Sequence, residues 1–265
     1  MHAASPDPTA LERARTLLSS AARVVVFTGA GVSAESGVPT FRGPGGMWNQ
    51  MRAEDLATPD AFARDPRLVW EWYAWRRELV ARCAPNAAHH AIAALAARRP
   101  GVTVVTQNVD GLHQRAARER ADAHGESPAA IVALHGTLFG VRCSRCDHRA
   151  PHDAPVDATS HDTLPRCPRC GALLRPDVVW FGEALDPDVL DRAFSDAARA
   201  DACLVVGTSA LVQPAASVAT TAVRAGAALI EVNAEATPLS ELARVSLRGA
   251  AGMIVPAILA GTPAG

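Results

Sequence analysis

The stretch TGAGVSAESGVPTFRG, residues 28–43, directly follows the apolar run Val24-Val25-Val26-Phe27. An apolar run of this length is typical of a buried parallel strand, so the glycines fall where a strand turns into a helix. Gly29, Gly31 and Ala34 form the pattern G-x-G-x-x-A, which allows a tight turn and close approach of the backbone to a pyrophosphate at the helix N-terminus. An ordinary glycine turn is the alternative.

The second half of this stretch, residues 36–43, is too rich in glycine and proline to continue a helix far. We therefore expect a loop that carries Phe41 and Arg42 over a bound cofactor. This continuation favours the dinucleotide interpretation over the ordinary turn.

Composition restricts the class of protein. The chain has 265 residues, 49% of them hydrophobic, which is enough for a substantial core. A formal net charge of −1, without a basic stripe, argues against nucleic acid or a membrane as a partner. The N-terminus has no basic region followed by an apolar core, and no run approaches the roughly 20 apolar residues of a membrane span. We expect a soluble cytoplasmic protein.

The rest of the chain alternates helix and strand patterns, which is typical of an α/β fold. We expect helices over residues 8–22, 68–80, 87–97, 188–200 and 215–224, and strands over 102–106, 131–134, 204–206, 228–232 and 252–256. Polar or small residues follow four of the strands, namely Gln107, Asn108 and Asp110, then His135, then Gly207, Thr208 and Ser209, then Asn233, Ala234 and Glu235. Open parallel sheets bind ligands at the carboxyl ends of their strands, so this edge is the predicted site.

Two of these groups have alternative interpretations. Gln107, Asn108 and Asp110 could serve as turn and capping residues, although three polar residues in four positions favour a site. His135 titrates near neutral pH and suits a general base at a strand end, but a histidine alone is as often a hydrogen-bonded structural residue.

Four cysteines, Cys143, Cys146, Cys167 and Cys170, form two pairs with two residues inside each pair and 20 between the pairs. Each pair can donate two thiolates to one ion from a single turn, and two pairs complete a tetrahedral zinc site. Since all four positions are filled by protein, we expect the zinc to be structural. A disulfide pairing is the competitor, which a cytosolic location disfavours.

Two further segments are ambiguous from pattern alone. Tyr73 and Arg76 lie three residues apart on one face of the helix expected at 68–80, where an arginine extending along an aromatic face is the simpler explanation. Residues 174–183 could form an extended edge that binds a peptide by strand addition, or a core strand.

Together these motifs resemble the sirtuins, a family of NAD-dependent protein lysine deacylases. The matching segments are GAGVSAESG at 29–37, TQNVD at 106–110, His135-Gly136, both cysteine pairs, FGE at 181–183, GTS at 207–209 and NAE at 233–235. They occur in the family's order and cover nearly all of residues 24–256, so the resemblance is far more specific than any single motif.

The resemblance implies one catalytic domain over residues 1–265. Its Rossmann-like parallel sheet, with helices on both faces, would use residues 24–135 and 176–258, and an inserted zinc-ribbon module would span 137–175, with 40–85 also in the small part. NAD is then consumed as a cosubstrate. The acyl oxygen attacks C1′ of the nicotinamide ribose, and His135 removes a ribose proton so that a hydroxyl attacks the alkylimidate. The products are nicotinamide, O-acyl-ADP-ribose and free lysine.

The resemblance also implies roles residue by residue. The resemblance assigns catalysis to His135, Asn108 and Asp110. NAD contacts fall to Gly29, Ala30, Gly31, Ala34, Glu35, Thr40, Phe41, Arg42, Trp48, Gln107, Asn108, Val109, Asp110, Gly207, Thr208, Ser209, Asn233, Ala234, Glu235 and Ala251. Substrate contacts fall to Ala57, Tyr73, Arg76, Val179, Phe181, Gly182 and Glu183. Partners are acylated lysine side chains of proteins, and we expect a monomer.

Within the family, Tyr73 and Arg76 resemble the Tyr-x-x-Arg pair of class III members, with Ala57 enlarging the acyl pocket. This resemblance replaces the simpler explanation of the helix face and implies removal of succinyl or malonyl groups, with acetyl removed more weakly. Three alternatives remain within enzymes, namely a deacetylase without acidic-acyl preference, a mono-ADP-ribosyltransferase and a nicotinamide oxidoreductase. An acyl-lysine binding module is the alternative of another class.

Overall fold

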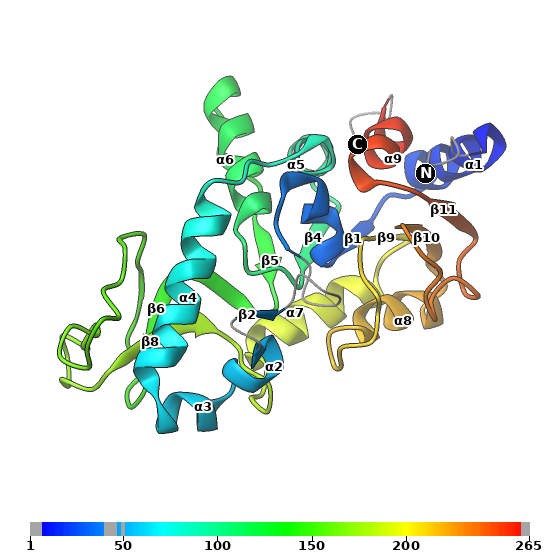
Figure 1. Cartoon of the computed structure of the whole chain (residues 1–265). Coiled ribbons are helices and arrows are strands. Elements are labelled where there is room, and N and C mark those ends of the chain that lie inside the picture. The colour runs from blue at the N-terminus through cyan, green and yellow to red at the C-terminus, as the bar shows by residue number, and fades with distance from the viewer. Residues whose placement is uncertain (1–6, 40–46, 49–50, 261–265) are drawn as a thin grey trace.

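The computed structural model describes residues 7–39, 47–48 and 51–260. Its central sheet consists of β1 (Val24–Thr28), β4 (Val102–Thr106), β5 (Ile131–Ala133), β9 (Ala202–Val206), β10 (Ala228–Asn233) and β11 (Val245–Arg248). These strands are parallel in the order β11-β10-β9-β1-β4-β5 (Figure 1). The order reverses between β1 and β9, because the chain first builds outward through β4 and β5 and later through β10 and β11. Open α/β sheets bind ligands at such a reversal.

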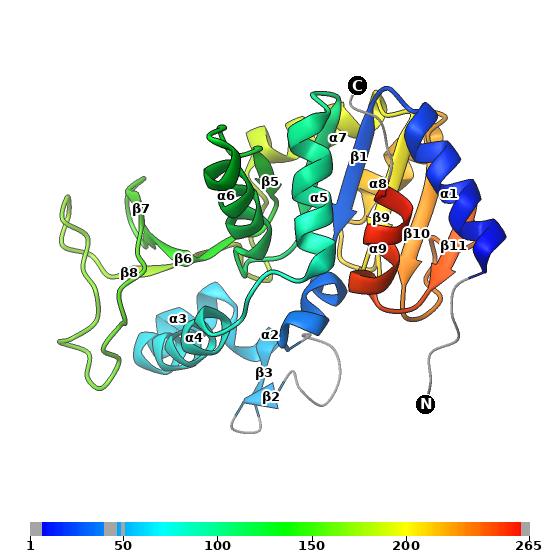
Figure 2. The same cartoon turned by 90° about the horizontal axis from the view of Figure 1, so that it is seen from above.

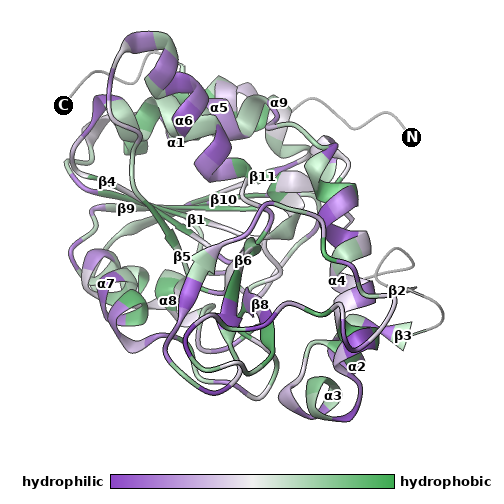
Figure 3. Cartoon of the chain, turned by 90° about the vertical axis from the view of Figure 1, so that its left-hand side faces the viewer, coloured by the Kyte–Doolittle hydropathy of each residue, from purple (hydrophilic) through white to green (hydrophobic). Residues whose placement is uncertain are grey.

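Helices cover both faces of the sheet. One layer contains α1 (Pro8–Ser20), α5 (Ala87–Arg98), α6 (Leu112–His124) and α9 (Ala251–Leu259), and the opposite layer contains α7 (Pro187–Ala198) and α8 (Ser217–Arg224) (Figure 2). β1 is buried along its whole length, with Val24 and Val26 in the core on the α1 and α5 side and Val25 and Phe27 in the core on the α7 side. In Figure 3 the central strands accordingly appear as a hydrophobic layer between the helices. Burial on both faces explains why these strands read as continuous apolar runs.

A smaller part packs beside this sheet. It contains α2 (Ala53–Leu56), α3 (Pro59–Arg64), α4 (Pro66–Ala81), the short hairpin of β2 (Met47–Trp48) and β3 (Met51–Arg52), and an antiparallel sheet of β7 (Arg149–Pro151), β6 (Gly136–Cys143) and β8 (Leu174–Val178) in that order. A core of its own joins α4 to β6 and β8, where Trp70 is fully buried and its indole N–H donates to the carbonyl of Leu174 at 2.9 Å. The cysteine pairs and the expected peptide segment belong to this part.

The expected α/β architecture is confirmed, and the helix expected from residue 87 starts there. Asp65 and Asn86 cap α4 and α5 with side-chain oxygens that accept from Leu68 N–H and from the amides of Ala88 and His89. The helix after the glycines is present as a short 3₁₀ helix, η1 (Ala30–Ser36), which ends at Gly37 with φ of 84°.

The expected strand at residues 252–256 is wrong. This stretch lies in α9, and β11 completes the sheet instead. A short apolar run does not distinguish a buried strand from a buried helix by periodicity, and α9 is buried through Ile254, Val255 and Ile258 against α1 and α5. None of the helices in the described part of the chain combines the length and apolar content that a membrane span needs.

Candidate active site

Six loops leave the carboxyl edge of the parallel sheet, and residues expected at the site lie on each of them. Gly29 follows β1, Gln107 to Asp110 follow β4, His135 follows β5 and Gly207 to Ser209 follow β9. Ala234 and Glu235 follow β10, and residues 249–251 follow β11. Because the strands are parallel, all of these groups meet at one edge.

The glycines of the first loop are explained by contact with the loop after β9. Gly31 N–H donates to the carbonyl of Gly207 at 2.7 Å, and Gly29 N–H donates to that of Val206 at 3.1 Å. A Cβ on Gly31 would stand 2.8 Å from Gly207 Cα, and one on Gly29 would stand 2.7 Å from Thr208 Cβ. The two central loops therefore interlock so tightly that neither glycine position admits a side chain.

His135 is oriented by the loop after β4. Its Nδ1 lies 2.9 Å from the carbonyl oxygen of Gln107. A carbonyl oxygen only accepts, so Nδ1 carries the hydrogen and Nε2 keeps a free lone pair. Burial lowers the pKa of His135, and the bond to Gln107 opposes that shift. The ring is therefore a neutral base at neutral pH, as expected of a general base.

Ser33 connects three buried groups behind this loop. Its hydroxyl donates to Asp110 at 2.7 Å and accepts from the amide of Asn108 at 3.1 Å. His89 Nδ1 accepts from Asn86 N–H, so its Nε2 carries the hydrogen and donates to Ser33 at 3.3 Å. Burial raises the pKa of Asp110. The hydrogen bonds that its carboxylate accepts from Leu112 N–H and from Ser33 lower that pKa and offset part of the rise.

A second buried histidine extends this network. His113 Nε2 lies 3.0 Å from the hydroxyl of Thr28, which donates to Thr106 at 2.8 Å. The rings of His113 and His89 are 4.7 Å apart. Burial lowers the pKa of His89 to about 4 and that of His113 to about 3, so both stay neutral. Sequence reasoning missed Ser33, His89 and His113 as parts of the site, although Ser33 lies within the glycine stretch.

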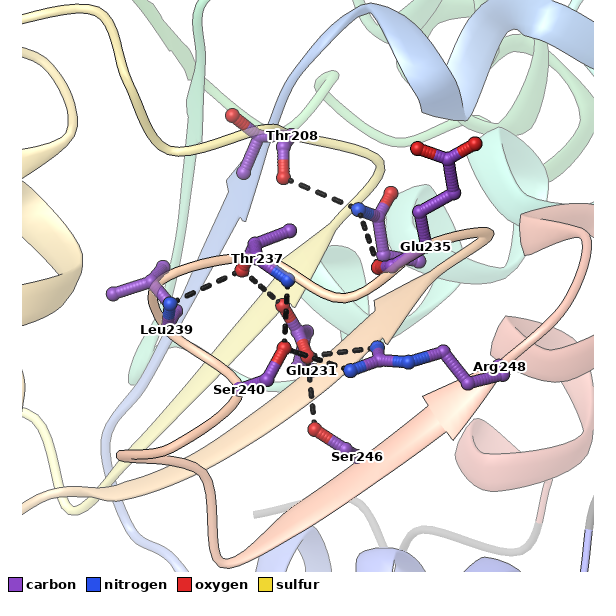
Figure 4. A network of polar contacts seen from close by, with 9 residues as sticks. Thr208, Glu231, Glu235, Thr237, Leu239, Ser240, Ser246 and Arg248 are labelled. Carbon is purple, nitrogen blue, oxygen red and sulfur yellow. Dashed lines mark hydrogen bonds and ion pairs between the residues drawn. The ribbon is translucent and has the colours of Figure 1, made fainter.

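Beside the site, a buried carboxylate in β10 joins the loop after β10 to strand β11 (Figure 4). Glu231 accepts from Ser240 at 2.7 Å, from Ser246 at 2.8 Å and from Thr237, and it pairs with Arg248 at 2.8 Å. Burial alone raises the pKa of Glu231, but these bonds outweigh it and lower the pKa. Glu231 therefore holds the loop of residues 234–244 against the end of β11.

The remaining expected NAD residues lie around these loops. Asn233 Nδ2 donates to the carbonyls of Thr208 at 3.5 Å and Glu235 at 3.1 Å. Gln107 Nε2 donates to the hydroxyl of Thr208 at 2.9 Å, and Glu35 accepts from Gly252 N–H at 2.5 Å, next to Ala251. Val109 and Ala251 are buried, whereas Ala34, Glu35, Ala234 and Glu235 are exposed, and Ala30 and Ser209 are half-buried. Thr40, Phe41, Arg42 and the side chain of Trp48 lie outside the described residues.

The segment after β8, residues 179–183, runs between His135 and the helices of the smaller part. Val179 N–H donates to the carbonyl of His135, and Phe181 N–H donates to that of Ala57, both at 2.9 Å. Phe181 is 50% exposed, and Gly182 has φ of 86°. The carboxylate of Glu183 accepts from Trp180 N–H at 2.9 Å, which fixes the turn. β8 is buried and lies at the edge of its sheet, so the core strand is confirmed, and peptide binding by this segment stays a prediction.

Tyr73 and Arg76 lie on one side of α4, and Tyr73 contacts the segment after β8. Tyr73 is fully buried, and its hydroxyl oxygen accepts from the indole N–H of Trp180 at 2.9 Å. Arg76 Cζ lies 5.6 Å from the ring centre of Tyr73 and 4.8 Å from that of Trp72. Burial raises the pKa of Tyr73 to about 12 and lowers that of Arg76 to about 10, so at neutral pH the phenol is neutral and the guanidinium charged.

The four cysteines of the two pairs come together at the far end of the small sheet. Their sulfurs all lie within 4.8 Å of one another, with Cys143 to Cys170 at 3.5 Å and Cys146 to Cys167 at 3.6 Å. A tetrahedral zinc with Zn–S bonds of about 2.3 Å holds its sulfurs about 3.8 Å apart. The geometry therefore fits a structural zinc ion bound by four thiolates.

The sequence of the site region matches a known family model. The model described as "Sir2 family" matches residues 29–214, from the first glycine of the central loop to beyond the β9 loop. The chain belongs to the Sir2 family. It is therefore a sirtuin.

Curated relatives and a solved structure agree with this assignment. The sirtuin is 47% identical to an NAD-dependent protein deacylase of Pyrococcus abyssi over 94% of this chain and 96% of the relative. It is 50% identical to NAD-dependent protein deacylase 1 of Archaeoglobus fulgidus over 88% of this chain and 89% of the relative. The crystal structure of a Sir2 homologue in complex with NAD superposes with a TM-score of 0.86 at 46% identity, covering 95% of this chain and 93% of that one. The sirtuin is an NAD-dependent protein deacylase with NAD as cosubstrate.

Proposed function

We propose that this sirtuin removes succinyl and malonyl groups from lysine side chains in preference to acetyl groups. The products are free lysine, nicotinamide and O-acyl-ADP-ribose. The observation that carries the proposal is the position of Arg76 beside the buried phenol of Tyr73, with Cζ 5.6 Å from the ring centre.

This pair suits a terminal carboxylate. Arg76 stays charged at neutral pH and lies partly buried on an aromatic face, where a second charge of opposite sign is bound more strongly than in water. A guanidinium presents several donors to a carboxylate, and a phenol hydroxyl adds another. An acetyl group has no carboxylate, so it offers these donors no charged acceptor to bind.

Ala57 supports the same preference through its size. It is 7% exposed, and its carbonyl holds the peptide-side segment through Phe181 N–H. A methyl side chain at this point leaves more room beside α4 than a larger residue does, and a succinyl chain needs that room.

We propose that His135 accepts the proton at Nε2 during acyl transfer. Its Nδ1 is occupied by Gln107, so only Nε2 can act as the base. Asn108 and Asp110 would bind the nicotinamide end, supported by Ser33, which ties the two side chains together. NAD supplies the electrophilic ribose carbon, and the loops after β1, β9, β10 and β11 would hold the remainder of the dinucleotide.

The substrate peptide would lie along Val179 and the turn of Phe181, Gly182 and Glu183. Their position between His135 and Ala57 and the exposure of Phe181 support this role. We further propose that residues 1–265 form one catalytic domain, with the NAD part at 24–135 and 176–258 and the zinc module at 137–175. We also propose a location in the reducing cytoplasm, which is supported by six cysteines that form no disulfide and by the four of them that suit a zinc site.

One reaction series tests the proposal. Acetyl, malonyl and succinyl versions of one peptide are incubated separately with the enzyme and NAD, and the products are identified by mass spectrometry. The proposal predicts O-succinyl- and O-malonyl-ADP-ribose in larger amounts than O-acetyl-ADP-ribose. An equal or larger yield from the acetyl peptide would contradict it.

A further inference from the structure

We infer that Trp180 is a positioning residue for acyl selectivity, because it orients the Tyr73 hydroxyl as a hydrogen-bond donor to the acyl carboxylate. The inference rests on the proposed function, since it concerns recognition of an acidic acyl group. It adds a residue that contacts the selectivity pair from a different element, 107 positions along the chain from Tyr73.

The direction of one hydrogen bond carries the argument. The Trp180 indole nitrogen lies 2.9 Å from the Tyr73 hydroxyl oxygen, and both side chains are buried. An indole N–H can only donate, so the hydroxyl oxygen must accept. The indole thus occupies one lone-pair side of the phenol and directs the hydroxyl hydrogen to the other side. A carboxylate only accepts, so it needs a partner held in this donating state.

The indole of Trp180 is itself held on several sides. Arg175 Cζ lies 3.8 Å from the centre of its ring, and the ring of Phe62 lies 5.4 Å away. Glu183 accepts from Trp180 N–H and pairs with Arg175 at 2.8 Å. One partly buried ion pair thereby fixes the ring face and the backbone of Trp180, so its indole N–H has a defined direction.

Selectivity follows from this geometry. The terminal carboxylate of a succinyl or malonyl group accepts the hydrogen bond from the Tyr73 hydroxyl, whereas an acetyl group has no terminal carboxylate to accept it. Loss of the indole N–H should therefore weaken recognition of the acidic acyl groups and leave acetyl removal nearly unchanged.

The test compares Trp180→Phe with Trp70→Phe. Phenylalanine keeps an aromatic ring but removes the N–H in both cases. Trp70 is a matched control because it is buried in the same core and donates to a backbone carbonyl at the same distance of 2.9 Å, away from the Tyr73 hydroxyl. We expect Trp180→Phe to lower kcat/KM for a succinyl peptide about three- to tenfold, mainly through KM, as loss of one oriented hydrogen bond does. The succinyl-to-acetyl ratio should be unchanged in Trp70→Phe.

A combined variant separates orientation from packing. In Tyr73→Phe there is no hydroxyl to orient, so adding Trp180→Phe should not change the succinyl-to-acetyl ratio further. A ratio that falls again in the double variant would overturn the inference, and so would a Trp180→Phe enzyme that keeps the full succinyl preference. If the unmodified enzyme shows no preference for succinyl over acetyl, the proposed function itself is contradicted.

A second measurement does not depend on a variant that folds. Tyr73 is the only tyrosine in the chain, so tyrosine isotopically labelled at Cζ gives a single NMR signal. In the unmodified protein without NAD, we expect that signal to move when a succinyl-lysine peptide is added and to stay in place with the acetyl-lysine peptide at equal saturation. An equal displacement by both peptides would overturn the donor role.

Discussion

His135 Nδ1 donates a hydrogen bond to the carbonyl oxygen of Gln107 over 2.9 Å, which ties the base on the β5 loop to the polar loop after β4. Burial lowers the pKa of His135 below the usual 6.5. A base with a lowered pKa remains unprotonated to a lower pH, so the acid limb of the deacylation rate should be centred below pH 6.5. A rate profile from about pH 5 to about pH 8 checks this, with His135→Ala as control.

In that control, deacylation should fall at least about 100-fold while binding of the acyl peptide persists. An acid limb centred above pH 6.5 would show that the folded protein raises the pKa of the base. An active His135→Ala enzyme would remove His135 from catalysis altogether.

The selectivity pair gives the second prediction. Arg76→Ala should reduce kcat/KM for a succinyl peptide about ten- to a hundredfold, because a hydrogen bond to a charged group is lost, and it should change acetyl removal little. Arg67→Ala is the matched control on α4, since Arg67 forms an exposed ion pair with Glu71 at 3.2 Å. Equal losses for both peptides in Arg76→Ala would mean that Arg76 acts on the fold or on NAD.

The two buried histidines predict how stability depends on pH. Their folded pKa values of about 4 for His89 and about 3 for His113 lie below the unfolded value of 6.5, so the unfolded chain binds more protons below pH 6.5. The free energy of unfolding should therefore fall with acidification, by about 1.4 kcal/mol per pH unit for each histidine between 6.5 and its folded pKa.

Urea denaturation of the unmodified protein and His113→Gln at several pH values measures this slope. The variant should show a shallower dependence, whereas replacement of the exposed His124 on the same helix should leave the slope as it is. A His113→Gln protein with the full slope would place the titration elsewhere.

The cysteine cluster predicts one bound zinc that stabilises the small part. Cys167→Ser should lower the zinc content well below one ion per chain and lower the thermal midpoint, because a tetrahedral site loses one of its four ligands. Cys83→Ser, at a buried cysteine outside the cluster, should keep the full zinc content. Metal analysis and thermal melts of both variants give the comparison, and full zinc in Cys167→Ser would exclude it as a ligand.

The sequence predicted the features that depend on short spacings. The helix that starts at residue 87, the strand ends that carry Gln107 and His135 and the cysteine pairs all follow from neighbouring residues. α9 was mistaken for a strand because an apolar run of a few residues has no decisive period.

Contacts between distant segments were not predictable in this way. Ser33 meets Asp110 across 77 positions, and Trp180 meets Tyr73 across 107. Only the folded arrangement of α4, β8 and the sheet edge brings these donors and acceptors together. Trp180 in particular carries no motif of its own, although it stands between Val179 and Phe181, which the resemblance had singled out.

A competition experiment tests the central claim most directly. Equal amounts of a succinyl-lysine and an acetyl-lysine version of one peptide are mixed with the enzyme and NAD, and the two ADP-ribose esters are followed by mass spectrometry. The account predicts that O-succinyl-ADP-ribose forms first and in excess, together with nicotinamide. Preferential formation of O-acetyl-ADP-ribose would contradict it.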